Sequence, residues 1–293
     1  WGYGLSGRSS AALGALLFWT VGDFFIQKTS RTLGIWKALF FITALGAIVL
    51  FPFIQSDLST VLTIEKSVLI LSLMSVVMLF AALFDFEALK EGKFAIIEPI
   101  LGIELPVTVG LGVYFLNEQL SSLQLGLIAI IFVGIVLAVT THFKHLHYHR
   151  RILERGVIFA GIGSVGMALA NFLTGVSSQV TNPLMTIWFM HTFLAIVSLG
   201  YLMMNGNAWS MINDLKKYPK MILTESVCDN LSWIFYAAAM TLIPISIATA
   251  ISEGYIAFGA LLGVMINKEK LKKHQVIGII LTITGVIALA MIN

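Results

Sequence analysis

Long runs of apolar residues, separated by short polar turns, make up most of the chain. A helix needs about 20 apolar residues to cross a hydrocarbon core about 30 Å thick. The runs lack the alternation of apolar and polar residues that a strand of a membrane barrel requires. The pattern predicts ten membrane-spanning helices, at roughly 10–27, 34–54, 67–88, 94–116, 122–141, 156–178, 183–204, 219–240, 244–266 and 274–292. We therefore expect an all-α membrane protein.

The composition supports this reading. Of 293 residues, 58% are hydrophobic and 11% are charged, whereas a water-soluble domain carries about 25% charged residues. So few charges cannot cover a water-facing surface, which excludes a soluble enzyme and a disordered chain. Ten spans would leave only short loops, so we expect no domain outside the membrane. Cys228 is the single cysteine and has no partner for an internal disulfide.

The sequence also repeats itself. A shift of 151 residues places Glu118 on Glu269 and Gly134 on Gly285, within turns and helices of similar pattern. The repeat unit is then about five helices, and an odd number of spans reverses the orientation of the second copy. We therefore expect two inverted five-helix repeats.

The repeat sets the expected domain organisation. The first repeat covers residues 8–141, a basic, His-rich linker covers 142–155, and the second repeat covers 156–293. Inverted repeats are typical of secondary transporters, whose binding site lies near the middle of the membrane between the two copies. This duplication is the strongest sequence argument for a transport function.

A family resemblance follows from particular stretches. Residues 99–134 extend into "LQLGLIAIIFVGIVLAV", residues 243–290 contain "GALLGVMINKEKLKKHQVIGIILTITGVIALA", and Leu16–Thr20 read "LLFWT". These stretches resemble the EamA-type members of the drug/metabolite transporter superfamily, over nearly the whole chain. The resemblance implies ten helices around a central cavity and movement of small metabolites by alternating access. It does not identify the solute.

Acidic residues inside the predicted spans are the main candidates for a site. Such residues are costly in lipid and commonly face a cavity or a partner. Helical spacing puts Glu225 and Asp229 on one face of the eighth span, and Glu253 ends a second polar stripe in the ninth. The predicted solute-binding residues are Glu225, Asp229, Glu253, Glu104, Asp23, Asn171 and the aromatic residues Trp19, Trp233, Tyr236 and Tyr255.

Each candidate has a structural alternative. The carboxyl groups could instead be buried and hydrogen-bonded to neighbouring helices, and the aromatic residues could be packing residues or interface anchors. Asp85 and Glu87 could lie at the membrane interface, because Lys90 follows them closely.

The predicted function follows from the sign of these charges. An acidic cavity with few compensating basic groups favours a cationic or zwitterionic solute, such as an amine or amino acid. Glu225, Glu253 and Glu98 are candidates for proton coupling, because a buried carboxyl group can exchange a proton as a cavity opens to each side. The alternatives are a passive channel and an intramembrane carboxylate-dependent hydrolase.

Other chemistries find no support. The cluster His142, His145, His147 and His149 fits no standard zinc spacing and is interpreted as part of the basic linker. No HExxH or GxSxG motif is present. We expect no catalytic residue, metal, cofactor or nucleic-acid partner. The expected partners are a small solute and the lipid bilayer. The oligomeric state stays open, and a monomer would suffice.

The positive charges favour one face of the membrane. All but two of the 18 Lys and Arg residues lie near one set of loops, and Arg8 and Lys66 are the exceptions. The positive-inside rule places the basic loops in the cytoplasm and so both termini outside. The family resemblance implies the opposite, with both termini in the cytoplasm, and the two readings stay open. We expect a multi-pass protein of a prokaryotic inner membrane.

Overall fold

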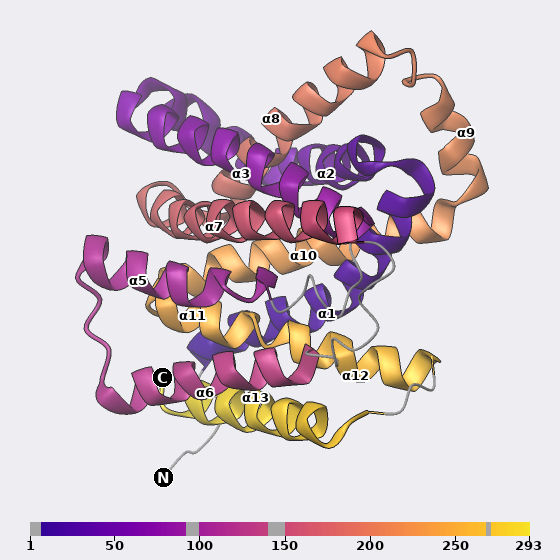
Figure 1. Cartoon of the computed structure of the whole chain (residues 1–293). Helices are drawn as coiled ribbons and strands as arrows, with labels where there is room; N and C mark the ends of the chain where they lie inside the picture. The colour runs from indigo at the N-terminus through magenta and orange to yellow at the C-terminus, as the bar shows by residue number, and fades with distance from the viewer. Residues whose placement is uncertain (1–6, 92–99, 140–149, 268–270) are drawn as a thin grey trace.

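The chain is helical throughout its described part (Figure 1). The computed structural model describes residues 7–91, 100–139, 150–267 and 271–293, and no strand occurs in these ranges. The helices are α1 (Gly7–Leu33), α2 (Ile35–Thr63), α3 (Glu65–Glu91), α5 (Glu104–Leu116), α6 (Ser122–Val139), α7 (Arg150–Val180), α8 (Pro183–Met204), α9 (Ser210–Lys217), α10 (Pro219–Leu242), α11 (Ile245–Ser252), α12 (Tyr255–Asn267) and α13 (Lys273–Met291). The predicted all-α class is confirmed for these residues.

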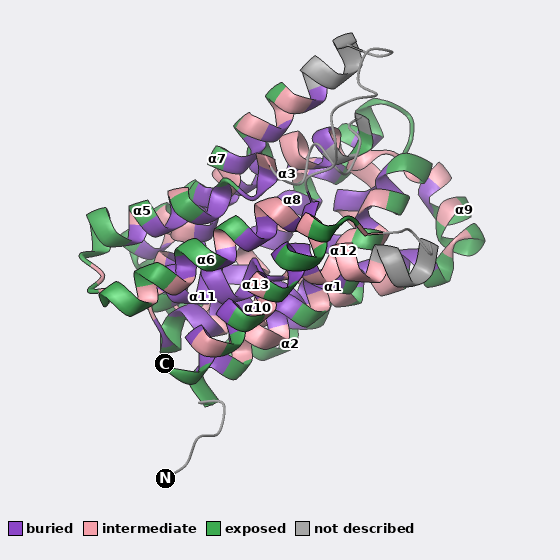
Figure 2. Ribbon diagram, turned by 60° about the horizontal axis from the view of Figure 1, so that its bottom comes forward, coloured by how far each residue is buried: buried purple, intermediate pink, exposed green. Residues whose placement is uncertain are grey.

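The outer surface of the helices is apolar. Figure 2 shows exposed residues along the outer faces and buried residues between the helices. Large apolar side chains such as Leu69 and Phe53 are 68% and 66% exposed. An extended apolar surface of this kind is stable when lipid chains cover it. In water it would promote aggregation.

Eight segments in the described part of the chain are long and apolar enough to cross a membrane, against ten predicted from the sequence. Two of the ten predicted spans are not among these eight segments, for different reasons. Helix α5 is apolar but has only 13 residues. Helix α10 has 24 residues, but its polar stripe, which includes Glu225, Asp229 and Asn230, makes it less apolar. The structure therefore supports a multi-pass membrane protein without establishing the count of ten.

Two of the predicted spans, 94–116 and 244–266, contain an interruption. Turns at residues 102–103 and 253–254 divide the helices, and the shift of 151 residues carries one turn onto the other. Gly254 occupies the second turn, where an added Cβ would lie 2.9 Å from side-chain atoms of Leu16 and Val286. Interrupted helices at equivalent places in two repeats are a recurrent feature of transporter binding sites.

The first interruption is supported by helix α7. The Ser164 hydroxyl donates a hydrogen bond of 2.6 Å to the carbonyl oxygen of Ile100, and lies 3.3 Å from that of Leu101. A carbonyl group freed by a broken helix is costly in the membrane unless another group bonds it. The Ile100 carbonyl oxygen also accepts from the Ile103 backbone nitrogen at 3.1 Å, so Ser164 adds a second hydrogen bond at the break.

The two halves of the chain are interlocked. The most extensive helix pairs are α3 with α7, α1 with α10, α6 with α13 and α2 with α8, and each pair joins one half to the other. The repeat relates α1 to α7 and α3 to α10, so it converts the first two pairs into one another. Figure 1 shows α13 beside α6 and α7 beside α3.

Glycines allow the closest of these approaches. A Cβ at Gly134 on α6 would lie 2.5 Å from the Thr282 hydroxyl and 2.9 Å from the Gly278 carbonyl oxygen, both on α13. A Cβ at Gly278 would collide with the backbone of Gly134 and Ala138. The contact between α6 and α13 thus depends on two positions without side chains, as is common between membrane helices.

Candidate functional site

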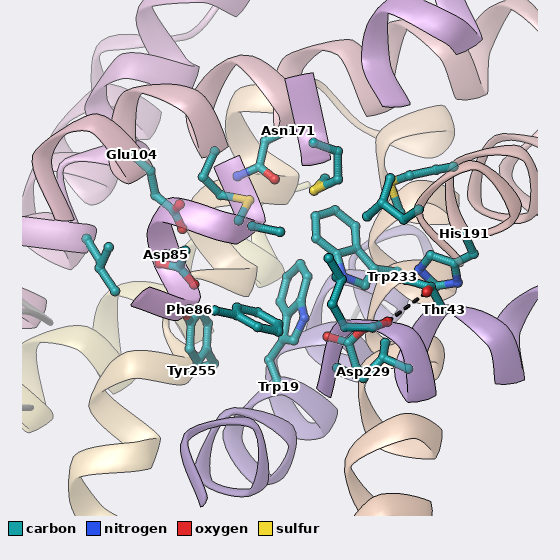
Figure 3. Close-up of a pocket in the computed structure, with 18 of the residues that line it drawn as sticks. Trp19, Thr43, Asp85, Phe86, Glu104, Asn171, His191, Asp229, Trp233 and Tyr255 are labelled. Carbon is teal, nitrogen blue, oxygen red and sulfur yellow. Dashed lines mark hydrogen bonds between the residues drawn. The ribbon is translucent and has the colours of Figure 1, made fainter. Parts of the chain in front are cut away.

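A polar cavity lies among the central helices. Its volume is about 80 Å³, enough for a few water molecules. Helices α1, α2, α3, α5, α7, α8, α10 and α12 line it, whereas α6 and α13 do not. Both halves therefore contribute to the same space (Figure 3).

Seven of the predicted binding residues line this cavity, namely Trp19, Glu104, Asn171, Asp229, Trp233, Glu253 and Tyr255. In Figure 3, Glu104 and Asp85 lie at one side of the cavity, His191 and Thr43 lie at the other, and Trp19 lies between them. The cavity thus has two polar ends separated by aromatic rings.

Glu104 and Glu253 lie at the two helix interruptions. Glu104 is the first residue of α5, and Glu253 lies between the end of α11 and the start of α12. Their side chains share a hydrogen bond. A hydrogen bond between two carboxyl groups requires one proton between them. While this bond is formed, the two carboxyl groups therefore cannot both be ionised.

Asp229 lies against the aromatic part of the cavity. The indole N–H groups of Trp19 and Trp233 approach its carboxylate as hydrogen-bond donors. The two indole rings meet edge to face, with centroids 5.2 Å apart, and the Tyr255 ring lies 5.8 Å from that of Trp19. A carboxyl group beside electron-rich ring faces is an arrangement that suits a cation.

Asp23 and Tyr236 lie behind the lining residues. The Tyr255 hydroxyl forms a hydrogen bond with Asp23. Tyr236 is fully buried, packs 5.0 Å from the Trp19 ring and forms a 2.7 Å hydrogen bond with the Thr249 hydroxyl. Neither residue lines the cavity. Tyr236 therefore supports Trp19 and is not the cavity wall that the sequence predicts.

The structure separates Glu225 from the cavity. Glu225 lies one turn before Asp229 on α10, but α1 packs over this part of α10. Its carboxylate faces Thr29, is fully buried, and neither oxygen has a hydrogen bond of normal geometry. The polar stripe of α10 thus continues past the cavity into the interface with α1.

Asp85 lines the cavity although its sequence context suggested the membrane interface. Lys90 pairs with Glu87, at 3.3 Å, and not with Asp85. Asp85 instead faces Glu104, with which it interacts electrostatically. Gly163 lets α7 pack closely against α3 at Asp85, since an added Cβ would lie 3.2 Å from the Asp85 backbone nitrogen.

His191 is a second lining residue outside the predicted set. Its ring faces the Asn230 side chain, whose amide nitrogen donates to the carbonyl oxygens of Ile42 (2.9 Å) and Ser226 (2.8 Å). Gly46 makes room for both groups, because a Cβ there would collide with Asn230 Oδ1 and His191 Nδ1. The available signal in the sequence was that His191 is a histidine at membrane depth.

The cavity is strongly acidic. Asp85, Glu104, Asp229 and Glu253 line it, and none of the lining residues in the described part of the chain is Lys or Arg. Burying several carboxyl groups without basic partners costs free energy, so protons or a bound cation must balance them.

Two other predicted features remain outside this description. Glu98 and the four histidines of the 142–155 linker lie outside the described residues. Among the residues that are described, no group of three or more His, Cys, Asp or Glu side chains could hold a metal ion.

Interlocked halves with an apolar exterior, interrupted helices and an internal polar cavity define a multi-pass membrane protein of the transporter type. The family model described as "EamA-like transporter family" matches residues 9–140 and 154–291, and the chain belongs to this family. A solved structure described as "Crystal structure of protein" is similar with a TM-score of 0.74 over 97% of this chain and 96% of that chain. At 13% identity, that likeness shows the fold. No curated protein matches the sequence.

Proposed function

We propose that the chain is a secondary active transporter that moves a small cationic or zwitterionic solute, such as an amine or amino acid, by alternating access. The observation that carries this proposal is a cavity lined by four carboxyl groups and by no Lys or Arg among the described residues. Trp19, Trp233 and Tyr255 add ring faces that attract a cation. An anionic solute would meet uncompensated negative charge.

Seven residues form the proposed contact surface for the solute: Trp19, Glu104, Asn171, Asp229, Trp233, Glu253 and Tyr255. Asp23 acts through Tyr255, and Tyr236 holds Trp19. Asp85 and His191 join the set because they line the same space.

Proton coupling is the proposed source of energy. The Glu104–Glu253 pair holds a proton that a positively charged solute could displace, which would give exchange of a solute for a proton. Glu225 is a second candidate, because an ionised carboxylate without hydrogen-bond donors is costly in a buried position. Glu98 is retained as a candidate from its position in the sequence.

The proposed architecture comprises two inverted repeats, residues 8–141 and 156–293, joined by a linker at 142–155. The proposed location is a prokaryotic inner membrane. Under the positive-inside rule, the start of α1 with Arg8 and the end of α2 with Asp57 would face outward. The start of α2 with Lys37 and the end of α9 with Lys217 would face the cytoplasm. A compartment-sensitive reporter fused to one terminus tests this orientation.

Transport by purified protein in proteoliposomes tests the function. Amines and amino acids are first ranked by the thermal stabilisation they give to the purified protein, with nucleotides and organic acids as the anionic comparison. A carrier gives saturable uptake that accelerates when unlabelled solute is present on the opposite side. Flux that stays linear with concentration would indicate a channel, and solute breakdown would indicate an enzyme.

A further inference from the structure

An apolar groove lies at the lipid-facing side of the fold, apart from the central cavity. It has a volume of about 520 Å³ and shares no lining residue with that cavity. Its walls come from α2, α8 and the short helix α9, and include Phe40, Phe41, Leu199, Met203, Ile212 and Leu215. Apolar walls and this volume suit a single hydrocarbon chain.

Helix α9 has the character of a helix that lies along the membrane interface. It connects α8 to α10 at the edge of the molecule (Figure 1). Met211 is buried, Ile212 and Leu215 face the groove, and Trp209 just before the helix is 83% exposed. An exposed tryptophan beside an amphipathic helix is typical of the boundary between lipid chains and headgroups.

The polar end of this helix carries unbalanced positive charge. Asp214, the acidic residue of α9, forms an ion pair of 2.6 Å with Lys37 on α2. Lys216 and Lys220 are exposed, and neither has an acidic partner in the part of the chain that the structure describes. Lys217 lies 5.1 Å from the centre of the Tyr218 ring. Three lysines thus follow directly on the apolar wall of the groove.

We infer that this groove binds an acyl chain of an anionic phospholipid, with the headgroup held by Lys216, Lys217 and Lys220. The apolar walls accommodate the chain, and the lysines complement the headgroup charge. Zwitterionic lipids offer the same chain but no net charge, so the site distinguishes lipids by their headgroups. The lipid also fixes the distance of α9 from α2 and α8, because its chain lies between them.

Fluorescence of Trp209 provides a direct test. The full-length protein is placed in nanodiscs of phosphatidylcholine that contain increasing fractions of chain-brominated phosphatidylglycerol, and the W209F variant supplies the signal of the other tryptophans. The difference between the wild-type and W209F signals reports Trp209. This difference should show quenching that saturates while the brominated lipid is still a minority component. Brominated phosphatidylcholine at the same fractions should quench several-fold less.

The lysines can then be removed one or two at a time. Each of K216Q and K217Q should lower the preference for phosphatidylglycerol roughly fivefold. The matched control is K272Q with K273Q, two exposed lysines at the start of α13 on the same predicted side of the membrane, which should leave the preference unchanged. Circular dichroism and thermal unfolding verify that each variant is folded.

Three results would overturn the inference. Equal quenching by the two brominated lipids would show ordinary surrounding lipid without headgroup selection. An unchanged preference in the double variant K216Q/K217Q would remove the lysines from the site. Trp209 shielded from both lipids, together with cross-linking of two chains through this face, would show a second copy in the groove.

Discussion

The carboxyl groups of Glu104 and Glu253 share a hydrogen bond where the two interrupted helices meet. Each residue comes from a different half of the chain, so any relative movement of the halves acts on this bond. If the halves separate at this point, the shared proton loses one of its two acceptors. Under the proposed proton coupling, this bond would link the proton content of the cavity to the separation of the two halves.

Glu253→Gln should separate solute exchange from proton coupling. Glutamine can donate its amide hydrogen to Glu104 and so keep the contact, but it cannot release a proton. In proteoliposomes, exchange of labelled for unlabelled solute should persist, while accumulation driven by a pH gradient should be lost. Glu87→Gln, which alters the ion pair with Lys90 outside the cavity, should accumulate solute normally. Normal accumulation by Glu253→Gln would contradict the assignment.

Asp229→Asn should weaken solute binding without unfolding the protein. Asparagine keeps an oxygen acceptor for the Trp19 and Trp233 indoles but removes the negative charge. Loss of a charge-assisted contact in a cavity corresponds to roughly a 10- to 100-fold rise in Kd for a cationic solute. Titration calorimetry on purified protein measures this change. Asp57→Asn, on an exposed carboxylate at the end of α2, serves as the control, and equal affinities in both variants would exclude a role for Asp229.

Glu118 should contribute measurably to stability. Its carboxylate accepts hydrogen bonds from the backbone nitrogens of Ile245 (2.6 Å) and Ser246 (3.1 Å), at the start of α11. Glu118→Ala would leave these donors without an acceptor and should cost about 1–2 kcal/mol of unfolding free energy. Glu118→Gln retains one acceptor oxygen and should lose less. Thermal unfolding in detergent compares the two variants with the wild type. Identical unfolding temperatures would show that the hydrogen bonds from the start of α11 to Glu118 are dispensable.

Gly278→Val should destabilise the contact between α6 and α13. A side chain there would collide with the backbone of Gly134 and Ala138, and overpacking of this kind costs about 1–3 kcal/mol or more. Gly259 on α12 is the matched control, because a Cβ at that position meets no atom within 4 Å. Gly259→Val should therefore unfold near the wild-type temperature. A larger effect at Gly259 than at Gly278 would show that the helix contact differs from the one described.

The sequence predicted the helical class and much of the cavity, because both depend on local spacing. Asp229 and Glu253 were found from helical stripes, and both line the cavity. The same stripe also pointed to Glu225, which helix α1 covers. Spacing identifies a polar face, but which neighbouring helix covers each part of that face depends on tertiary packing.

Asp85 shows that neighbours in the sequence can also point away from the cavity. Lys90 lies nearby in sequence, which favoured an interfacial position, yet Lys90 turns to Glu87 one helical turn away. The interruptions of the helices were equally hidden, because neither turn contains a proline and the apolar pattern resumes directly after each of them. What distinguishes Gly254 is the pair of side chains from α1 and α13 that crowd it, and these come from distant parts of the chain.

The interlocked pairing of helices has a consequence for the integrity of the molecule. Since α1 is covered by α10 and α3 by α7, neither half buries its own apolar and polar faces when it stands alone. The covalent link between the halves is then secondary to their mutual packing. A protease cut within residues 142–155 would change the connectivity of the chain, yet both fragments should stay associated and unfold together as one cooperative unit.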